Sequence, residues 1–211
     1  MSAAFLRDTI ENILLAAALA PIEAYAAYSP RGSELILQPH IGNGAKLLLA
    51  DGEAPMPDGV EGFGRCLLQA IQEMLARGHV AACVLSSDCP SLPTRLLSEA
   101  AEILLAPGEH GVLGAARDGG YYLLGLKAPH AQLFKDVAWS TSSVADETRA
   151  RAREIGLELT ELDIWYDVDD AASLGLLLNE QEGYAAPNTA AVIERLGLRS
   201  PQFQTKLGRS G

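Results

Sequence analysis

Acidic residues at three places in the 211-residue sequence have the type and setting to bind a metal ion or to accept a proton. Asp88 comes shortly after the apolar run from Val80 to Leu85, Asp118 precedes two glycines, and Asp169 lies in the acidic group Asp167–Asp170. Carboxylate oxygens are good ligands for Mg²⁺ and Mn²⁺, and these ions can bridge the phosphates of a nucleotide. The three acids are therefore candidates for a nucleotide-binding or phosphate-binding site.

Each of these acids also has a purely structural interpretation. Asp88 precedes Pro90, and aspartate in such a place commonly caps a turn or helix. Asp118 followed by glycine between two apolar segments is a strong signal for a β-hairpin turn. Asp169 stands near the start of a helix-like segment, where the helix dipole favours negative charge. The residue types alone leave both interpretations open.

Residues close to these acids could contact a ligand. Gly119 and Gly120 permit close approach of the backbone, whereas consecutive strand residues point to opposite faces, so only one of the two tyrosines that follow can face a ligand. Hydroxyl groups near Trp139 could bind a ligand or cap the next helix. The predicted substrate-binding residues are Ser87, Gly119, Gly120, Tyr121, Tyr122, Trp139, Ser140 and Thr141. The sequence contains no motif of serine hydrolases, P-loop nucleotidases or zinc enzymes, so these classes have no local support.

The hydrophobic pattern predicts alternating strands and helices that would hold these residues in place. Strands are expected at 22–28, 35–37, 47–49, 80–85, 111–115, 121–126 and 157–162, and helices at 3–19, 60–75, 93–106, 143–155, 169–178 and 190–196. This order predicts one α/β domain over residues 1–198, with a doubly wound, mostly parallel sheet, and a C-terminal tail at 199–211. The continuous apolar run 80–85 is typical of a central strand. Ligands of such sheets bind beyond the carboxyl ends of the strands.

Composition narrows the classes of partner. Apolar residues make up 48% of the chain, charged residues 20%, and the formal net charge is −11. This negative charge argues against nucleic acid or an anionic membrane as a partner. No apolar stretch reaches the roughly 18 residues of a membrane span. The segment after Met1 lacks the basic and apolar pattern of a secretory leader, so we expect neither a membrane span nor export. Three cysteines without metal-type spacing fit a reducing compartment, so we expect a cytoplasmic protein.

Four motifs, taken together and in order, resemble one protein family. They are Ser-Ser-Asp-Cys-Pro-Ser-Leu at 86–92, Leu-Gly-Ala-Ala-Arg-Asp-Gly-Gly-Tyr-Tyr-Leu-Leu-Gly-Leu at 113–126, Trp-Ser-Thr at 139–141 and Tyr-Asp-Val-Asp at 166–169. The set resembles the bacterial GT-A-like glycosyltransferases of the arsenosugar-biosynthesis or selenodomain-associated type, within the nucleotide-diphospho-sugar transferase superfamily. The resemblance extends from Ala4 to Leu198.

This resemblance implies a GT-A, Rossmann-like fold and a metal-dependent glycosyltransferase that uses a nucleotide-sugar donor and a small-molecule acceptor. Asp88 and Asp169 would hold Mg²⁺ or Mn²⁺, and Asp118 would position or deprotonate the acceptor hydroxyl. Nucleotidyltransferases of the phospholactate guanylyltransferase type share this fold, so transfer of a nucleotidyl group to a small phosphorylated substrate is an alternative. A second alternative is a non-catalytic member that has lost its nucleotide-binding loop.

The sequence departs from the family pattern in three places. Family members usually begin with a strand and a basic loop, whereas Met1 here falls within the helix that follows them. The family's acidic segment appears as Glu61-Gly62-Phe63-Gly64-Arg65-Cys66, and Arg117 replaces the acid before Asp118. We therefore expect the sheet to lack its usual first strand. An in-frame strand-like stretch in the DNA upstream of Met1 would indicate a start codon placed too far downstream.

Overall fold

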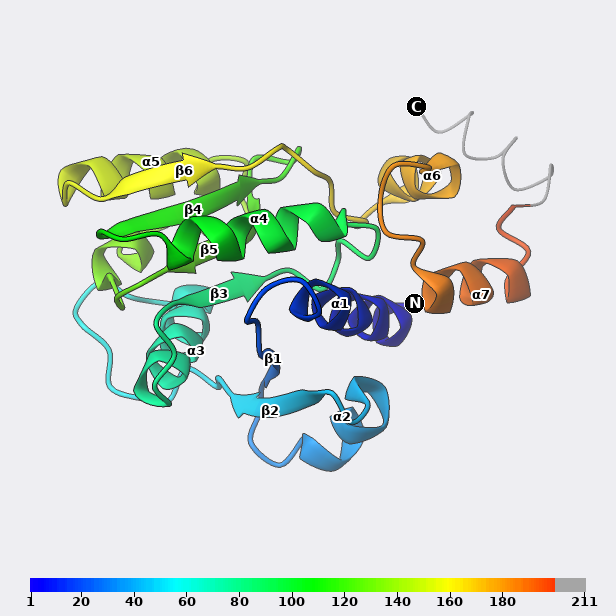
Figure 1. Cartoon of the computed structure of the whole chain (residues 1–211), viewed down its shortest axis with the longest axis horizontal. Coiled ribbons are helices and arrows are strands. Elements are labelled where there is room, and N and C mark those ends of the chain that lie inside the picture. The colour runs from blue at the N-terminus through cyan, green and yellow to red at the C-terminus, as the bar shows by residue number, and fades with distance from the viewer. Residues whose placement is uncertain (200–211) are drawn as a thin grey trace.

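The structure is a computed structural model, and it describes residues 1–199. Figure 1 shows a layered α/β arrangement in which helices lie on both sides of a sheet. The strands are β1 (Ala24–Tyr28), β2 (Ala45–Leu49), β3 (Ala82–Leu85), β4 (His110–Ala115), β5 (Tyr121–Leu126) and β6 (Glu158–Glu161). The helices are α1 (Ser2–Ala17), α2 (Glu34–Ile41), α3 (Phe63–Ala76), α4 (Thr94–Leu105), η1 (Ala131–Phe134), α5 (Val144–Glu154), α6 (Ala171–Asn179) and α7 (Pro187–Arg195).

The larger sheet has four strands in the order β3-β5-β4-β6. β5 pairs antiparallel with both β3 and β4, whereas β4 and β6 are parallel. Three of the four strands, β3, β4 and β6, therefore point in one direction, and β5 alone runs the other way. This arrangement confirms the predicted α/β fold with a mostly parallel sheet. It also brings the carboxyl ends of β3, β4 and β6 to the same edge of the sheet.

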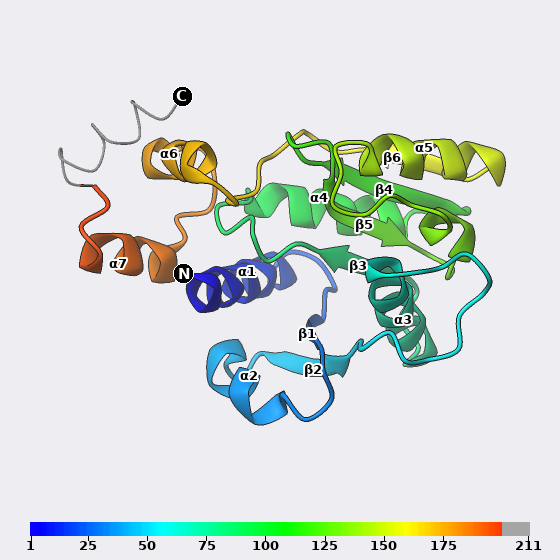
Figure 2. The same ribbon diagram turned by 180° about the vertical axis from the view of Figure 1, so that it is seen from behind.

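Two apolar cores lie on opposite faces of this sheet, as alternating side chains of its strands require. Val112 joins a core that includes Leu96 of α4, and the next residue, Leu113, joins a core that includes Ile71 of α3. All four side chains are fully buried. Figures 1 and 2, which view the molecule from opposite sides, show α4 on one face and α5 on the other. The doubly wound arrangement is thus present.

The two strands β1 and β2 form a separate parallel sheet. Both figures place it beside the larger sheet, with β1 nearer to β3 than β2 is. Among residues 1–199, β3 pairs only with β5, so the strand order has a break between β1 and β3. The expectation from the sequence that the usual first strand is missing stays a prediction. The prediction that residues 80–85 form a central strand is wrong, because β3 is an edge strand here and Val80 is 67% exposed.

The segment predicted as a strand at 35–37 is instead part of the helix α2. Leu35 and Ile36 are 87% and 70% exposed, so their apolar character does not reflect a place in the core. The reason lies in the topology: β1 and β2 are parallel, and parallel neighbours need a crossover connection, which is usually helical. The other predicted strands and helices correspond to elements of the structure, with bounds that differ by a few residues.

The structure also describes the state of the cysteines and the character of the helices. All three cysteines, Cys66, Cys83 and Cys89, are free thiols. None of the helices within residues 1–199 combines the length and the apolar character that a membrane crossing needs. The predicted tail 199–211 lies, from Ser200 onward, outside the described residues.

Candidate functional site

Asp88 and Asp169 are brought together by a direct contact between their two segments. The backbone N–H of Val168 donates a hydrogen bond of 2.8 Å to the carbonyl oxygen of Asp88. The Asp88 backbone N–H in turn lies 3.2 Å from the hydroxyl of Ser86, which accepts from it. Asp88 is half-buried beyond the carboxyl end of β3, and Asp169 is exposed. The two residues predicted to hold a cation therefore lie at one edge of the sheet.

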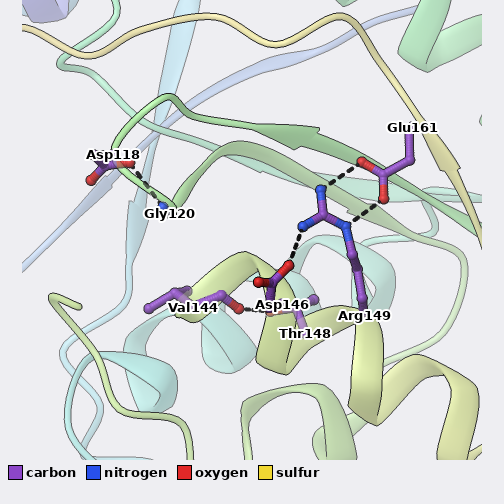
Figure 3. Close-up of polar contacts among 7 residues, drawn as sticks. All are labelled: Asp118, Gly120, Val144, Asp146, Thr148, Arg149 and Glu161. Carbon is purple, nitrogen blue, oxygen red and sulfur yellow. Dashed lines mark hydrogen bonds and ion pairs between the residues drawn. The ribbon is translucent and has the colours of Figure 1, made fainter. Parts of the chain in front are cut away.

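A short stretch of parallel strand pairing brings Asp118 close to a second acid, Asp167. Ala116 pairs with Trp165 in a parallel bridge, and the Arg117 N–H donates to the Trp165 carbonyl over 3.0 Å. Two residues beyond that bridge on each side stand Asp118 and Asp167. The Asp118 carboxylate accepts a 2.8 Å hydrogen bond from the Gly120 N–H through Oδ1, which leaves Oδ2 for another partner (Figure 3).

The electrostatic environment of these acids is that of a shared, partly desolvated negative cluster. Desolvation raises the pKa of Asp88 above its usual value, and the charge of Asp169 adds to the effect. Desolvation also raises the pKa of Asp167 to about 6, with further contributions from Asp118 and Asp169. Like charges held close together disfavour ionisation of their neighbours. A bound cation would relieve this repulsion, so the cluster favours a positively charged ligand.

The donor set agrees with one kind of metal site only. No group of three or more His, Cys, Asp or Glu side chains within the described chain is arranged to enclose a metal ion. A closed structural site is thus not present there. Mg²⁺, however, is usually held by one or two carboxylates together with substrate phosphates and water. The pair Asp88 and Asp169 fits that mode, in which the substrate completes the coordination.

The loop that carries Asp118 is fixed against the start of α5. A Cβ atom on Gly119 would lie 2.0 Å from the carbonyl oxygen of Ser142, and Gly119 has φ +93°. The Ala145 N–H donates to the Gly119 carbonyl over 2.9 Å. Helix α5 is itself tied to β6, because Arg149 makes a two-pronged contact with Glu161 at 2.7 and 3.0 Å (Figure 3). Only glycine fits at position 119 in this arrangement.

The hairpin interpretation of the Asp-Gly-Gly motif is also correct, since β4 and β5 pair antiparallel on either side of it. Tyr121 and Tyr122 point to opposite faces, as predicted: Tyr122 belongs to the core beneath α4, and Tyr121 packs against the other core. The Tyr122 hydroxyl donates to the Asp163 carbonyl over 2.8 Å. The Tyr121 hydroxyl is buried without a partner among the described residues. Ligand binding by either tyrosine stays a prediction.

The remaining predicted binding residues lie in two different settings. Trp139 packs its ring against Phe63 and Phe134, with centroid distances of 5.9 and 6.5 Å. Thr141 donates to the Ala138 carbonyl over 2.7 Å, and Ser140 is exposed with φ +62°. These contacts show a structural role for Trp139 and Thr141 near the start of α5, and ligand binding by Trp139, Ser140 and Thr141 remains a prediction.

Ser87 stands next to Asp88 and is half-buried. Its carbonyl oxygen accepts a 3.4 Å hydrogen bond from the hydroxyl of Thr9 in α1. The contact anchors the segment after β3 to α1, so the backbone of Ser87 has a structural function. Its side chain has no contact that assigns it to a ligand, and substrate binding by Ser87 stays a prediction.

Three residues of this region, Asp167, Arg117 and Tyr166, are not among the site residues predicted from the sequence. Asp167 lies in the same acidic motif as Asp169, but only the parallel pairing with the Asp118 loop reveals that the two acids are neighbours. Arg117 and Tyr166 line a cavity of about 390 Å³ beside them. The guanidinium carbon of Arg117 lies 5.4 Å from the centre of the Tyr166 ring. The replacement of an acid by Arg117 was the one sequence signal for this feature.

We predict that Asp167→Asn stabilises the protein at neutral pH in the absence of divalent cations. The pKa of Asp167 is about 6 in the folded chain, above the ordinary value of 3.8, so this residue contributes stability below pH 4 that is lost as the pH rises through 6. The variant avoids this loss. Because solvent screens a partly exposed group, we expect a rise in Tm of about 2 °C at pH 7.5 and none at pH 4. Thermal unfolding in EDTA measures both, with Asp58→Asn in the exposed loop before α3 as a control; an equal gain at both pH values would contradict the prediction.

Comparisons with known proteins identify the fold and the family of this chain. The chain is similar to a crystal structure from Desulfovibrio desulfuricans G20, named "putative nucleotide-diphospho-sugar transferase". The TM-score is 0.73 at 22% identity, over 94% of this chain and 84% of that one, which shows a common fold. A comparison with curated protein sequences gave no match. The family model described as "Uncharacterized protein conserved in bacteria (DUF2064)" matches residues 13–141, which is more than half of the chain. The protein therefore belongs to the DUF2064 family of bacterial proteins and shares the fold of that Desulfovibrio protein.

Proposed function

We propose that this protein is a glycosyltransferase that uses a nucleotide-sugar donor, a divalent cation and a small-molecule acceptor. The observation that carries the proposal is the meeting of Asp88, Asp118, Asp167 and Asp169 at the edge where β3, β4 and β6 end. In α/β sheets of this kind, ligands bind at that edge. The fold shared with the Desulfovibrio protein supports the same class of reaction.

The acids divide into two pairs with different tasks. Asp88 and Asp169 would hold Mg²⁺ or Mn²⁺, and the ion would supply positive charge to the departing diphosphate. Asp118 has one carboxylate oxygen fixed by the Gly120 N–H, so the other can accept a hydrogen bond or the proton of the acceptor hydroxyl. Asp167, whose pKa is raised to about 6, can share that proton.

Two further parts of the proposal rest on the sequence. The four motifs favour a place in the arsenosugar-biosynthesis or selenodomain-associated group. The three free cysteines agree with a reducing, cytoplasmic location. Ser87, Trp139, Ser140 and Thr141 complete the proposed substrate-binding set, together with the loop glycines and one of the two tyrosines.

The experiment that tests this proposal is the substitution Asp88→Asn. Asparagine keeps the size of the side chain but removes the negative charge that a divalent cation needs. We expect Mn²⁺-dependent binding of a nucleotide sugar, such as UDP-glucose or GDP-mannose, to weaken by at least about tenfold. Thermal stability without metal should stay the same or rise, because the variant removes one charge from an acidic cluster.

A matched control is Asp170→Asn. Asp170 stands next to Asp169 but caps α6, where its carboxylate accepts a 2.7 Å hydrogen bond from the Ser173 N–H. Asparagine caps a helix about as well as aspartate, and the net charge changes by the same amount. Calorimetric titration of Mn²⁺ and donor into the three proteins should show loss in Asp88→Asn alone. Equal binding in all three defeats the metal assignment.

Two measurements separate the alternatives. Release of pyrophosphate from a nucleoside triphosphate would indicate nucleotidyl transfer instead of glycosyl transfer, because only nucleotidyl transfer cleaves the bond between the α- and β-phosphates. Failure of the wild-type protein to bind any nucleotide with Mn²⁺ would favour the non-catalytic alternative.

A further inference from the structure

The cavity of about 390 Å³ that lies beside the acidic cluster has its own charged group. It is bounded on one side by Arg117 and Tyr166, and on the other by α6 and the segment that follows, with Leu176 and Glu180 among its lining residues. Arg117 immediately precedes Asp118, and Tyr166 immediately precedes Asp167. The cavity therefore opens next to the two carboxylates proposed to handle the acceptor proton. Its volume is at the lower end of the range found for small-molecule sites.

Two acids, Glu180 and Glu182, line this cavity, and Glu180 is already engaged by neighbouring groups. Its Oε1 accepts hydrogen bonds from the backbone N–H groups of Gln181, Glu182 and Gly183, at 2.9, 2.7 and 3.2 Å. Its Oε2 accepts from the Tyr166 hydroxyl at 3.1 Å. These four donors, three from its own loop and one from Tyr166, satisfy the carboxylate. The side chain of Glu180 is thus held in place to shape the cavity wall.

Arg117, in contrast to Glu180, is not engaged by a group of opposite charge among the described residues. Within residues 1–199 it takes part in no ion pair, and its side chain is placed by contact with the Tyr166 ring, 5.4 Å from guanidinium carbon to ring centre. The ring contact leaves the edges of the guanidinium group available as hydrogen-bond donors. A planar guanidinium fork matches the two oxygens of a carboxylate or phosphate group.

We propose that this cavity is the acceptor subsite and that Arg117 selects an acceptor carrying an anionic oxyacid group, either carboxylate or phosphate. The inference rests on the proposed glycosyl transfer and specifies its acceptor. In a protein of net charge −11, an anionic acceptor is repelled by the surface and by the acidic cluster. The local cation at position 117 offsets this repulsion. Arg117 also orients the acceptor. The anionic group of the acceptor is held beside Tyr166, while a hydroxyl of the acceptor can reach Asp118.

The test uses three sugars that differ only in the group of interest: glucose 6-phosphate, glucuronate and glucose. Binding to the metal-free protein without donor is measured by NMR titration. We expect at least one of the two anionic sugars to bind about tenfold more tightly than glucose. Arg117→Gln should abolish this preference. The identity of the preferred sugar tells whether the site is built for phosphate or carboxylate.

Arg77→Gln is the matched control. Arg77 also lies over a tyrosine, 5.2 Å from the Tyr25 ring centre, and also lines a cavity, one of about 450 Å³ bounded by Asp51 and Gln69. This variant makes the same change in net charge and should keep the preference. Absence of any preference in the wild-type protein, its survival in Arg117→Gln, or its equal loss in both variants would each overturn the proposal.

Failure of this inference can be distinguished from failure of the proposed function. The sugar titration contains neither metal nor nucleotide, so it reports on the cavity alone. The Mn²⁺ and nucleotide-sugar titration of Asp88→Asn reports on the donor side alone. Loss of the first result with the second intact leaves a glycosyltransferase whose acceptor is not selected by Arg117.

Discussion

Replacing Gly119 by alanine is expected to lower the free energy of unfolding by about 3 kcal/mol. Two effects add at this position. A Cβ atom would lie 2.0 Å from the Ser142 carbonyl oxygen, which belongs to backbone and cannot rotate away. The φ angle of +93° is also one that residues with a side chain rarely adopt. In a chain of this length, such a loss corresponds to a fall in Tm of roughly 6–12 °C.

Gly78→Ala is a control that isolates the clash. Gly78 has φ +95°, which is nearly the same as that of Gly119, but nothing lies within 4 Å of the Cβ atom that it would gain. This variant therefore carries the backbone strain alone, about 1 kcal/mol. Chemical denaturation of both variants and the wild type gives the comparison. If the two substitutions cost the same, the close contact with Ser142 has no energetic weight.

The consequence for function follows from the position of Gly119 next to Asp118. A backbone shift that relieves the clash would move the loop away from α5 and, with it, the Asp118 carboxylate away from Asp167. Acceptor-side chemistry should suffer more than donor binding, because Asp88 and Asp169 are joined through a separate contact, the hydrogen bond from the Val168 N–H to the Asp88 carbonyl. Donor titration of Gly119→Ala with Mn²⁺ should therefore stay within about threefold of the wild type.

The parts of the fold that the sequence predicts best are those whose pattern reflects burial on both sides of the sheet. The stripe from Val60 to Leu75 predicts α3, and Leu68 and Ile71 of that helix are fully buried. The hairpin of β4 and β5 follows from the Asp118-Gly119 signal between two apolar segments. In both regions the local preference and the tertiary environment agree, so the local signal is sufficient.

Predictions from the sequence fail where tertiary context overrides the local pattern. Leu35 and Ile36 are apolar but exposed, and the need to connect two parallel strands makes their segment helical. The neighbourhood of Asp118 and Asp167 is set by a parallel bridge between residues far apart in the chain, which no local pattern encodes. The cavity at Arg117 arises from the same pairing, so it too becomes visible only in the folded chain.

Asp8 is the clearest example of a polar residue whose role lies outside its own helix. It stands on α1 but is fully buried, and a helical pattern of apolar residues gives no reason for its burial. Its carboxylate accepts hydrogen bonds from the backbone N–H groups of Asn188 and Thr189, at 2.9 and 2.7 Å, and from the Asn188 side-chain amide at 2.8 Å. These donors belong to the first turn of α7, whose own N-cap residue, Ala186, offers no side-chain oxygen. Asp8 therefore caps α7 from a distance.

Replacing Asp8 by alanine is expected to cost about 3 kcal/mol of the free energy of unfolding. The substitution leaves two N–H groups at the start of α7 without an acceptor, one of them on the fully buried Thr189, and removes a negative charge that the helix N-terminus favours. It also removes one polar link between the neighbouring helices α1 and α7 (Figure 1), and leaves the 2.9 Å hydrogen bond from the Asn188 side-chain amide to Glu11. Chemical denaturation monitored by circular dichroism measures the loss.

Asp170→Ala is the comparison that gives this result its meaning. Asp170 caps α6 with the same chemistry, a 2.7 Å hydrogen bond from the Ser173 N–H, and α6 and α7 each have nine residues. Asp170 is exposed, however, so water can replace the lost acceptor, and we expect a cost of about 1 kcal/mol. If both variants lose the same amount, burial adds nothing to the cap at α7. A larger loss in Asp8→Ala establishes that a buried carboxylate from α1 holds α7 in place.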